Sequence, residues 1–529
     1  MPLNNEISII AVSDKDAEEN KHGTGYTNEG IAKKPADFET AIAAAGNGKF
    51  QYLLLLAVIP VSWAISIDTS NVAIILPSAE CDLQMTLFQK GVLNAINFVG
   101  MVLSGFLWGY VADMRGRRVV FMYGFLADGI CNVLSGFSQN FWTLAFFKFL
   151  SGCIISGPHA AIMTYCPEFH EVKSRVKVAL IVGFTGTFGN IMTAGMAWLI
   201  IPQTWSIVLW DGAFVYNSWR IFLSLCGIPI LIGVGCLSFF PESPKFLMSQ
   251  GRNEDALKVF KLIYRLNTGR SAQEYPISRL EDKSHYKADQ TQKSHRTAIF
   301  FNPHLPRLIM VTVLQFGAML EMNTIRLWQP QLFTMLENFQ SQYNGTEGND
   351  STFCEIMDLS IHKQNNFTAD AEGSICVNTV VNESVYMNTV IIAAFTNLCL
   401  LVTNLTLNIV NHKTLLSMCY GVAISCIVYL NWSTNMLSTL ILTCLFIGLM
   451  HVAMNMVIGV AVILFPTSLR TIAVSLVMTT GRLGSMIGSL LFPVLLAHGC
   501  LAPIISLAIF IIICIVSTYF LPLAKKTKK

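Results

Sequence analysis

Two charged residues interrupt apolar stretches in which a charge is costly. Asp68 lies in the middle of AISIDTSNVAII (64–75), and Lys148 opens KFLSG (148–152). A charged side chain at the centre of a bilayer costs at least about 2.5 kcal/mol, so such residues face a partner or a polar cavity. Two interpretations therefore stand side by side. Either Asp68 and Lys148 neutralise each other, or Asp68 binds a cationic solute.

A second group of polar residues lies in QFGAMLEMNTIRLWQP (315–330), just before Pro330. Proline frees backbone carbonyl groups, and in a membrane these must face protein or a cavity. We therefore expect this stretch to form part of a binding site. The candidate cavity residues indicated by polarity and position are Asp68, Lys148, Glu321, Asn323, Arg326, Trp328 and Asn455.

Long apolar helices must hold these residues in place. The chain has 529 residues, of which 53% are hydrophobic and 13% charged, whereas an ordinary soluble domain is about 25% charged. The net charge of +3 gives no argument for nucleic acid. A helix that crosses a bilayer needs about 20 apolar residues. Twelve segments meet that requirement, near 52–77, 88–112, 119–137, 142–165, 178–201, 219–240, 306–334, 388–410, 416–431, 437–463, 472–496 and 503–522.

The basic residues predict how these helices are oriented. Most Lys and Arg residues fall on the side of the N-terminus, which by the positive-inside rule is cytoplasmic. The first 49 residues have no apolar core segment, so no cleaved signal peptide is expected. We expect an all-α membrane protein of two six-helix bundles with both termini in the cytoplasm. Its parts would be a cytoplasmic segment (1–49), a first bundle (50–240), a cytoplasmic central loop (241–305) containing an amphipathic helix at 251–266, a second bundle (306–522) with an external loop (335–387), and a basic tail (523–529).

A short charged turn, GYVADMRGRR (109–118), separates the second and third apolar segments. Gly109 and Gly116 permit close approach and unusual backbone angles. Asp113 can accept hydrogen bonds at a helix end, while Arg117 and Arg118 keep the turn on the cytoplasmic side. Anchoring alone would explain the arginines but not the aspartate or the glycine spacing.

This turn resembles the signature motif of the major facilitator superfamily. PESPKFL (241–247), GRNEDA (251–256) and the spacing from Glu168 to Arg175 resemble its sugar and organic-cation porter branch. The resemblance implies two six-helix halves around a central site, a gate at this turn, and a basic residue in the fourth helix, here Lys148, tied to proton or substrate coupling. The implied gating residues are Gly109, Asp113, Gly116, Arg117, Arg118, Glu168, Arg175, Glu242, Arg252, Arg470 and Arg482.

Several stretches resemble the synaptic vesicle glycoprotein 2 family more specifically, among them FLWGYVADMRGRR (106–118) and MAWLIIP (196–202). That resemblance adds Trp198 to the candidate cavity residues, with an interfacial anchor as the alternative, and implies a glycosylated loop after the seventh helix. The chain departs from the pattern in its second half. The family pattern has a second copy of the signature turn, but the corresponding segment here, 407–416, has no Asp and no Gly-Arg pair. Ile458 and Ile463 occupy positions where acidic residues are typical.

The predicted external loop carries features of an extracytoplasmic segment. Asn-x-Ser/Thr occurs four times in it, and we expect at least one site to be glycosylated. A disulfide between Cys354 and Cys376, which share the loop, is one pairing to test. The four acceptor positions are Asn344, Asn349, Asn366 and Asn382.

Two functions remain open from sequence. The first is a secondary transporter of a small organic solute, a cation or a sugar-like molecule, that works by alternating access with a proton as candidate coupling ion. The second is a transporter-like glycoprotein that acts as a receptor or scaffold. In either case we expect a monomer in the plasma membrane or a vesicle membrane, with no enzymatic activity, cofactor, metal or nucleic-acid partner. The sequence has neither a Gly-x4-Gly-Lys-Ser/Thr loop nor nucleophile–base spacing in its polar segments.

Overall fold

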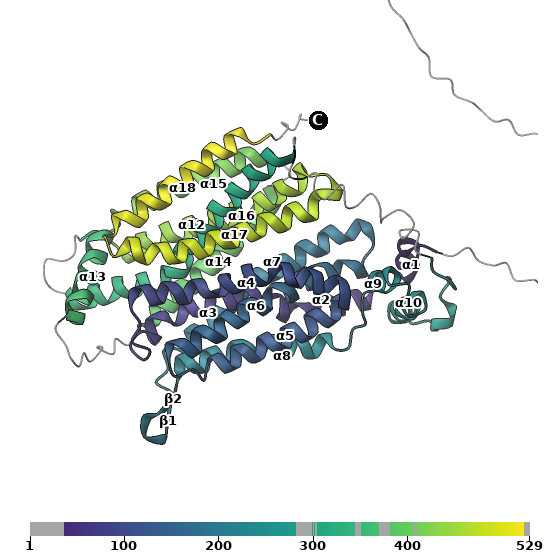
Figure 1. The fold of residues 1–529 in the computed structure, drawn as a ribbon, viewed down its shortest axis with the longest axis horizontal. Coiled ribbons are helices and arrows are strands. Elements are labelled where there is room, and N and C mark those ends of the chain that lie inside the picture. The colour runs from purple at the N-terminus through teal and green to yellow at the C-terminus, as the bar shows by residue number, and fades with distance from the viewer. Residues whose placement is uncertain are drawn as a thin grey trace, which may run out of the picture. The chain divides into compact units, whose positions relative to one another are not determined.

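The computed structural model describes residues 36–281, 299, 301, 304–343, 351–369, 381–406 and 410–522. In this part of the chain, twelve helical segments are long and apolar enough to cross a membrane. Figure 1 shows them running alongside one another. The twelve spans predicted from sequence are therefore confirmed, with shifts of a few residues at their ends.

The first half of the chain contributes six of these spans. The first span consists of two helices, α2 and α3, with a break at Trp63 that follows Pro60. Proline cannot donate its backbone nitrogen, so it weakens the helix at this point. The bounds in the first half are Lys49–Ser62 (α2), Ala64–Ala79 (α3), Leu87–Arg115 (α4), Arg117–Ser135 (α5), Phe141–Tyr165 (α6), Val172–Ile200 (α7) and Ser218–Leu237 (α8).

The second half contributes the other six. Its first helix, α12, has 40 residues and contains Pro330. It packs closely on α17, where a Cβ at Gly484 would lie 2.3 Å from the carbonyl oxygen of Phe316. The bounds are His304–Tyr343 (α12), Glu383–Thr406 (α14), His412–Leu430 (α15), Met436–Leu464 (α16), Thr467–Leu496 (α17) and Leu501–Phe520 (α18).

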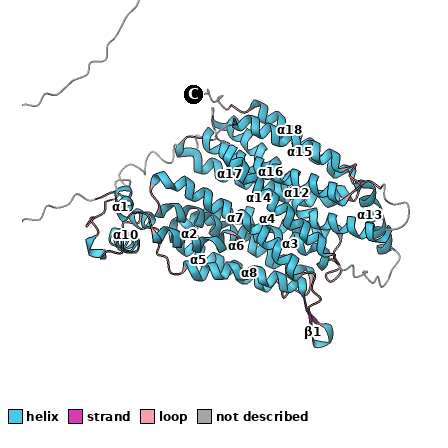
Figure 2. Cartoon of the chain, turned by 180° about the vertical axis from the view of Figure 1, so that it is seen from behind, coloured by secondary structure: helices cyan, strands magenta, loops and turns pink. Residues whose placement is uncertain are grey.

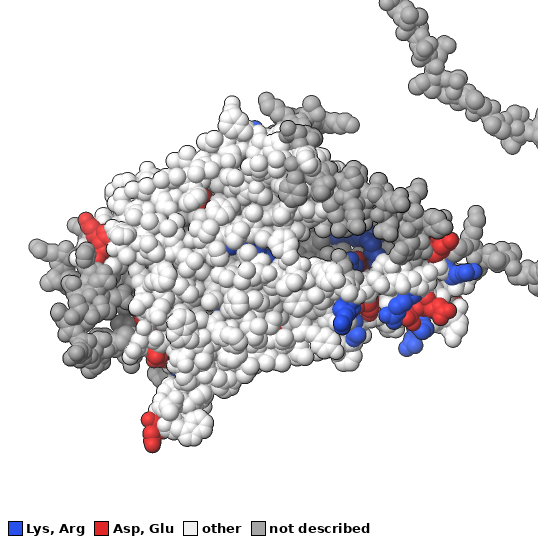
Figure 3. Space-filling model, in the orientation of Figure 1, with Lys and Arg blue, Asp and Glu red and all other residues white. Residues whose placement is uncertain are grey.

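Short helices gather at one end of the spans (Figure 1). We call this end the turn face, because the turn between α4 and α5 lies there, with Gly116 beside Phe246 of α9. The amphipathic helix predicted at 251–266 is confirmed as α10, and its apolar positions, such as Phe260, are buried. Phe38 of α1 packs on Phe260 with ring centroids 5.9 Å apart. Figure 3 shows charged side chains concentrated around this end, while the face over the spans is almost uncharged. The short helices are α1 (Phe38–Ala45), η1 (Cys166–Phe169), α9 (Pro244–Ser249), α10 (Asn253–Thr268) and η3 (Ala272–Glu274).

The opposite end, which we call the loop face, carries a hairpin and one further helix. The hairpin comprises β1 (Ser206–Leu209), η2 (Trp210–Gly212) and β2 (Phe214–Asn217), and Figure 2 shows it projecting beyond the end of α8. The helix α13 spans Phe353–Ala369 within the segment expected to be a loop.

A disulfide fixes α13 to the start of α18. It joins Cys354 to Cys500, whose Cα atoms are 5.2 Å apart, so the predicted pairing of Cys354 with Cys376 is wrong. Cys81 is also disulfide-bonded, and Cys376 lies outside the described residues. Proximity in sequence within one loop did not predict the disulfide pairing, because the fold brings Cys354 into contact with Cys500, 146 positions away.

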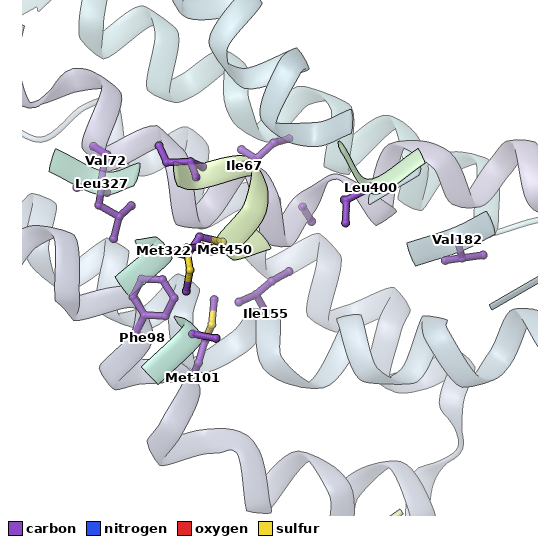
Figure 4. Close-up of a cluster of buried hydrophobic side chains, with 14 of the residues drawn as sticks. Ile67, Val72, Phe98, Met101, Ile155, Val182, Met322, Leu327, Leu400 and Met450 are labelled. Carbon is purple, nitrogen blue, oxygen red and sulfur yellow. The ribbon is translucent and has the colours of Figure 1, made fainter. Parts of the chain in front are cut away.

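An apolar cluster lies between the two halves. Figure 4 shows Phe98 and Met101 of α4 pointing toward Met322 of α12 and Met450 of α16. All four side chains are buried. Methionine adapts its shape easily, so this cluster can form a contact that tolerates repacking when helices shift.

Candidate functional site

The turn between α4 and α5 is built around Gly116, whose φ is +93°. A Cβ at this position would lie 2.6 Å from Oε2 of Glu242. Both oxygens of Glu242 accept the backbone N–H of Arg118, at 3.2 and 3.1 Å. Burial raises the pKa of Glu242 above its ordinary value, while its hydrogen bonds with Ser243 and Arg118 act in the opposite direction. The glycine thus leaves room for a carboxylate that caps α5.

An ion pair extends this arrangement to the end of α6. Arg117 pairs with Glu168, which is buried and also accepts a hydrogen bond from Ser243 Oγ at 2.5 Å. The Arg118 guanidinium donates to the carbonyl oxygen of Ser238 at 2.7 Å. These contacts bind the turn to the α8–α9 connection. Five of the predicted gating residues, Gly116, Arg117, Arg118, Glu168 and Glu242, therefore lie together.

The other predicted gating residues are spread more widely. Arg175 makes two hydrogen bonds of 2.8 Å to Glu39 of the segment before α2. Arg252 pairs with Asp255 one turn along on the exposed face of α10. A Cβ at Gly109 would meet nothing within 4 Å. Arg470, on α17 of the other half, has a buried Nε without a hydrogen-bond partner among the described residues. The side chain of Asp113 lies outside the described part of the structure.

Asp68 and Lys148 lie in one buried polar network inside the first half. Asn132 of α5 stands between them: its amide donates to Asp68 Oδ1 at 2.7 Å, and its carbonyl oxygen accepts from Lys148 Nζ at 2.9 Å. Asp128, one turn before Asn132, accepts from Ser151 Oγ at 2.7 Å. The side chains of all five residues are buried. Asp68 and Lys148 are thus connected through an amide, an arrangement that neither sequence-based interpretation contained.

A small cavity of about 40 Å³ lies between the two halves. Helices α3 and α7 line it from the first half, and α12, α14 and α16 from the second. Its polar lining includes Ser70, Asn190, Arg326, Thr389 and His451. The predicted residue Arg326 therefore lines a cavity between the halves, whereas Asp68 and Lys148 are not among its lining residues.

Arg326 makes all of its hydrogen bonds to uncharged acceptors. Its Nε and Nη2 donate to Asn323 Oδ1 at 3.1 and 2.8 Å, within the same helix. Its Nη1 donates across the interface to Ser70 Oγ at 2.8 Å and to Asn190 Oδ1 at 3.3 Å. Asn323 is held in turn by a hydrogen bond of 2.7 Å to Ser485 of α17.

The remaining predicted cavity residues point elsewhere. Glu321 is fully buried, and one of its oxygens lies 3.9 Å from the Cys514 sulfur on α18. Trp328 packs on Phe492 with ring centroids 5.2 Å apart. The Asn455 amide donates to the backbone carbonyl of His451, one turn earlier in the same helix. These three side chains do not line the cavity.

Hydrogen bonds join the halves at the loop face and near the middle of the spans. At the loop face, Trp198 donates to Glu383 at 2.8 Å, Ser78 bonds to Tyr386 at 2.7 Å, and Gln331 donates to Glu80 at 3.0 Å. Deeper in, Arg482 donates to Ser156 at 2.9 Å. Trp198 is thus a contact between the halves rather than part of the cavity wall.

Sequence reasoning did not identify several residues that the site uses. They are polar side chains inside apolar helices, and that polarity was the available signal. Ser70 lies two positions from Asp68, and Lys90 is a fully buried lysine that pairs with Glu80 at 2.5 Å. The residues missed are Ser70, Lys90, Asn132, Asn190 and Thr389.

The predicted glycosylation sites are described only in part. Asn382 is exposed just before α14. Asn366 belongs to α13, but its side chain is outside the described residues, as are Asn344 and Asn349 altogether. Use of these sites stays a prediction.

Comparison with known proteins agrees with the architecture. The sequence profile of the sugar (and other) transporter family matches residues 47–345. Synaptic vesicle glycoprotein 2A of Rattus norvegicus is 32% identical over 231 residues, covering 44% of this chain and 31% of that protein. Synaptic vesicle glycoprotein 2C of Homo sapiens is 32% identical over 267 residues, covering 49% of this chain and 36% of that protein. The chain therefore matches about a third of the length of these relatives.

Solved structures share the fold at low sequence identity. The partially occluded, inward open xylose transporter XylE from E. coli superposes with a TM-score of 0.62 at 15% identity, covering 89% of this chain and 98% of that one. A bacterial homolog of the human lysosomal transporter Spinster, in an inward-facing conformation, superposes with a TM-score of 0.59 at 12% identity, covering 90% and 98%. With its twelve membrane-type helices, the chain belongs to the sugar (and other) transporter family of the major facilitator superfamily.

Proposed function

We propose that this protein is a secondary transporter that carries a small organic solute by alternating access. The observation that carries the proposal is the polar cavity between the halves, lined by helices of both. A volume of about 40 Å³ is far smaller than the roughly 300–1,000 Å³ of a typical small-molecule pocket. A solute would therefore enter only when the halves move apart.

The distribution of contacts between the halves supports such a motion. The loop face is held by hydrogen bonds such as Ser78–Tyr386 and Trp198–Glu383. At the turn face, the ion pairs of Arg117 and Arg175 stay within the first half. Among the described residues, these contacts fit a carrier that is closed at the loop face and opens at the turn face. We infer that the turn face is cytoplasmic, because basic residues gather there.

The network around Asp68 is the proposed site of coupling to a proton. It holds two carboxylates, Asp68 and Asp128, and one ammonium, Lys148, all removed from water. One proton on either carboxylate would make this group of three charges neutral. The crystal structure of a D-xylose-proton symporter shares this fold. The carrier would work in the plasma membrane or in a vesicle membrane.

A second candidate function is a receptor or scaffold with little transport. It rests on the relatives, which are named as vesicle glycoproteins, and on the absence of the signature turn from sequence 407–416.

Transport of solutes into proteoliposomes, with and without a pH gradient, separates the two. An engineered disulfide between α7 and α14 provides the control. It would join cysteines at positions Thr187 and Asn397, whose side chains are in contact. In the variant Thr187→Cys with Asn397→Cys, oxidation should stop uptake and reduction should restore it. Each single cysteine variant should be insensitive to oxidation. Uptake that continues with this disulfide formed would contradict alternating access, and absence of uptake across the panel would favour the receptor.

A further inference from the structure

The cavity between the halves has an unusual charge. Among the described residues that line it, Arg326 is the one with a permanent charge, and no carboxylate lines it. Arg326 takes part in none of the ion pairs found in the described part of the chain. Its acceptors, Asn323, Ser70 and Asn190, are all neutral. The positive charge is therefore surrounded by neutral hydrogen-bond acceptors, and no carboxylate among the described residues pairs with it.

Neither Asp68 nor Glu321 forms an ion pair with Arg326. Asp68, two residues before Ser70, accepts from Asn132 inside the first half. Glu321, on the same helix as Arg326, is buried toward Cys514 of α18. A buried cation without a counter-ion is stabilised strongly by any anion that reaches it, because little water competes there.

The guanidinium is positioned for a ligand that sits between the halves. Asn323 accepts from Nε and Nη2 and so orients the group from within α12. Nη1 points across the interface to α3 and α7 and makes one good and one long hydrogen bond there, at 2.8 and 3.3 Å. Separation of the halves would break these two bonds and leave Nη1 available to an incoming acceptor.

We propose that the cavity binds an organic anion, a small carboxylate with an apolar body, whose carboxylate pairs with Arg326. This inference rests on the proposed transport function and names its class of substrate. Carboxylates match the planar guanidinium and accept two hydrogen bonds from it. The apolar body would lie against the isoleucines of the lining, Ile74, Ile392 and Ile447. An expectation of a cationic solute, based on Asp68, is replaced by the opposite charge.

The test uses the full-length protein in detergent and measures its thermal unfolding midpoint. The probes are matched sets with one carbon skeleton each: benzoate, benzamide and benzylamine; nicotinate, nicotinamide and 3-(aminomethyl)pyridine; and the straight-chain acids from butyrate to octanoate with their amides and amines. We expect at least one carboxylate to raise the midpoint by 2 °C or more while its amide and amine do not. Arg326→Gln should abolish that shift, and Arg265→Gln, on the exposed face of α10, should preserve it.

A second variant keeps the test informative if Arg326→Gln fails to fold. Ser70→Asp places a carboxylate on the residue that already contacts Nη1. It should raise the midpoint of the unliganded protein and remove the response to carboxylates. The proposal is overturned if no carboxylate exceeds its amide and amine, or if Ser70→Asp still responds. Proteoliposome uptake distinguishes a failure of the proposed transport function from a failure of the proposed anion site. Carboxylate binding without uptake would reject transport alone. Uptake restricted to amines or amides would reject the anion site alone.

Discussion

Tyr386 of α14 and Ser78 of α3 share a hydrogen bond of 2.7 Å between their hydroxyl groups, and the two residues belong to opposite halves of the protein. Tyr386 is fully buried. A second bond between the halves, from Trp198 to Glu383, lies at the same face but in a more exposed position. Because water competes for exposed groups, the two bonds should contribute unequally to closure of the loop face.

Tyr386→Phe should therefore open the loop face more than Trp198→Phe does. Loss of the buried bond should cost the closed state about 0.5–1.5 kcal/mol, which changes the equilibrium constant between the closed and open states roughly 2- to 13-fold. The measurement is the rate at which an impermeant maleimide labels Asn94→Cys, since Asn94 is buried at the contact with Leu327 of α12. Equal labelling rates in the two variants would contradict the assignment of Tyr386 as the stronger contact.

The sequence predicted helices well because their pattern is local. Apolar length defined the spans, and the spacing of residues such as Val259 and Phe260 defined the face that α10 buries. It did not predict which side chains meet, because that depends on the rotation of each helix and on contacts distant in sequence. Asn132 was overlooked although it joins Asp68 to Lys148, and Arg326 was grouped with Glu321, which points to a different helix.

Gly116 and Gly109 belong to one sequence motif but should respond differently to alanine. Gly116→Ala places a Cβ 2.6 Å from Glu242 Oε2 at a φ of +93°, so it should destabilise the fold by about 1–3 kcal/mol. Gly109 lies inside α4 with free space around it, so Gly109→Ala should be neutral or stabilising by up to about 1 kcal/mol. Thermal unfolding of both variants in detergent tests this. Similar losses in the two would show that the turn geometry does not matter.

The disulfide between Cys354 and Cys500 should be detected directly by mass spectrometry of an unreduced digest. Cys500→Ser should lower stability by about 2–4 kcal/mol, because the crosslink holds α13 against the start of α18. Cys236→Ser, at an exposed free cysteine, is the matched control and should have little effect. A peptide linking Cys354 to Cys376 would reject the pairing.

Glu242 should make stability depend on pH at the turn face. Its pKa is raised by burial above the ordinary value of 4.5, so the folded state holds the proton more tightly than the unfolded state. The contribution is therefore complete below about pH 4.5 and is lost as pH rises through the folded pKa. Between pH 4.5 and 7, Glu242→Gln should gain stability relative to the wild type. If the difference between their unfolding midpoints is constant with pH, the carboxylate is not the cause.

Asn132 should be as important to folding as the charged residues that it joins. Asn132→Leu removes the hydrogen bonds to Asp68 and Lys148 together and leaves both charges buried without this bridge. Breaking a buried charged arrangement in this way costs about 3–5 kcal/mol. We expect a marked fall in the yield of folded protein, measured by size-exclusion chromatography and thermal unfolding.

Neutralising the two charges together should restore that loss. In the triple variant Asn132→Leu, Asp68→Asn and Lys148→Gln, no buried charge of the pair remains, and the yield should recover while any pH-driven uptake stays absent. The variant Ser224→Ala, which removes a bond to the Val133 carbonyl next to Asn132, controls for local packing and should have a small effect. Full stability in Asn132→Leu alone would mean that Asp68 and Lys148 need no bridge, and a triple variant as unstable as the single one would show that the amide acts through packing rather than through charge.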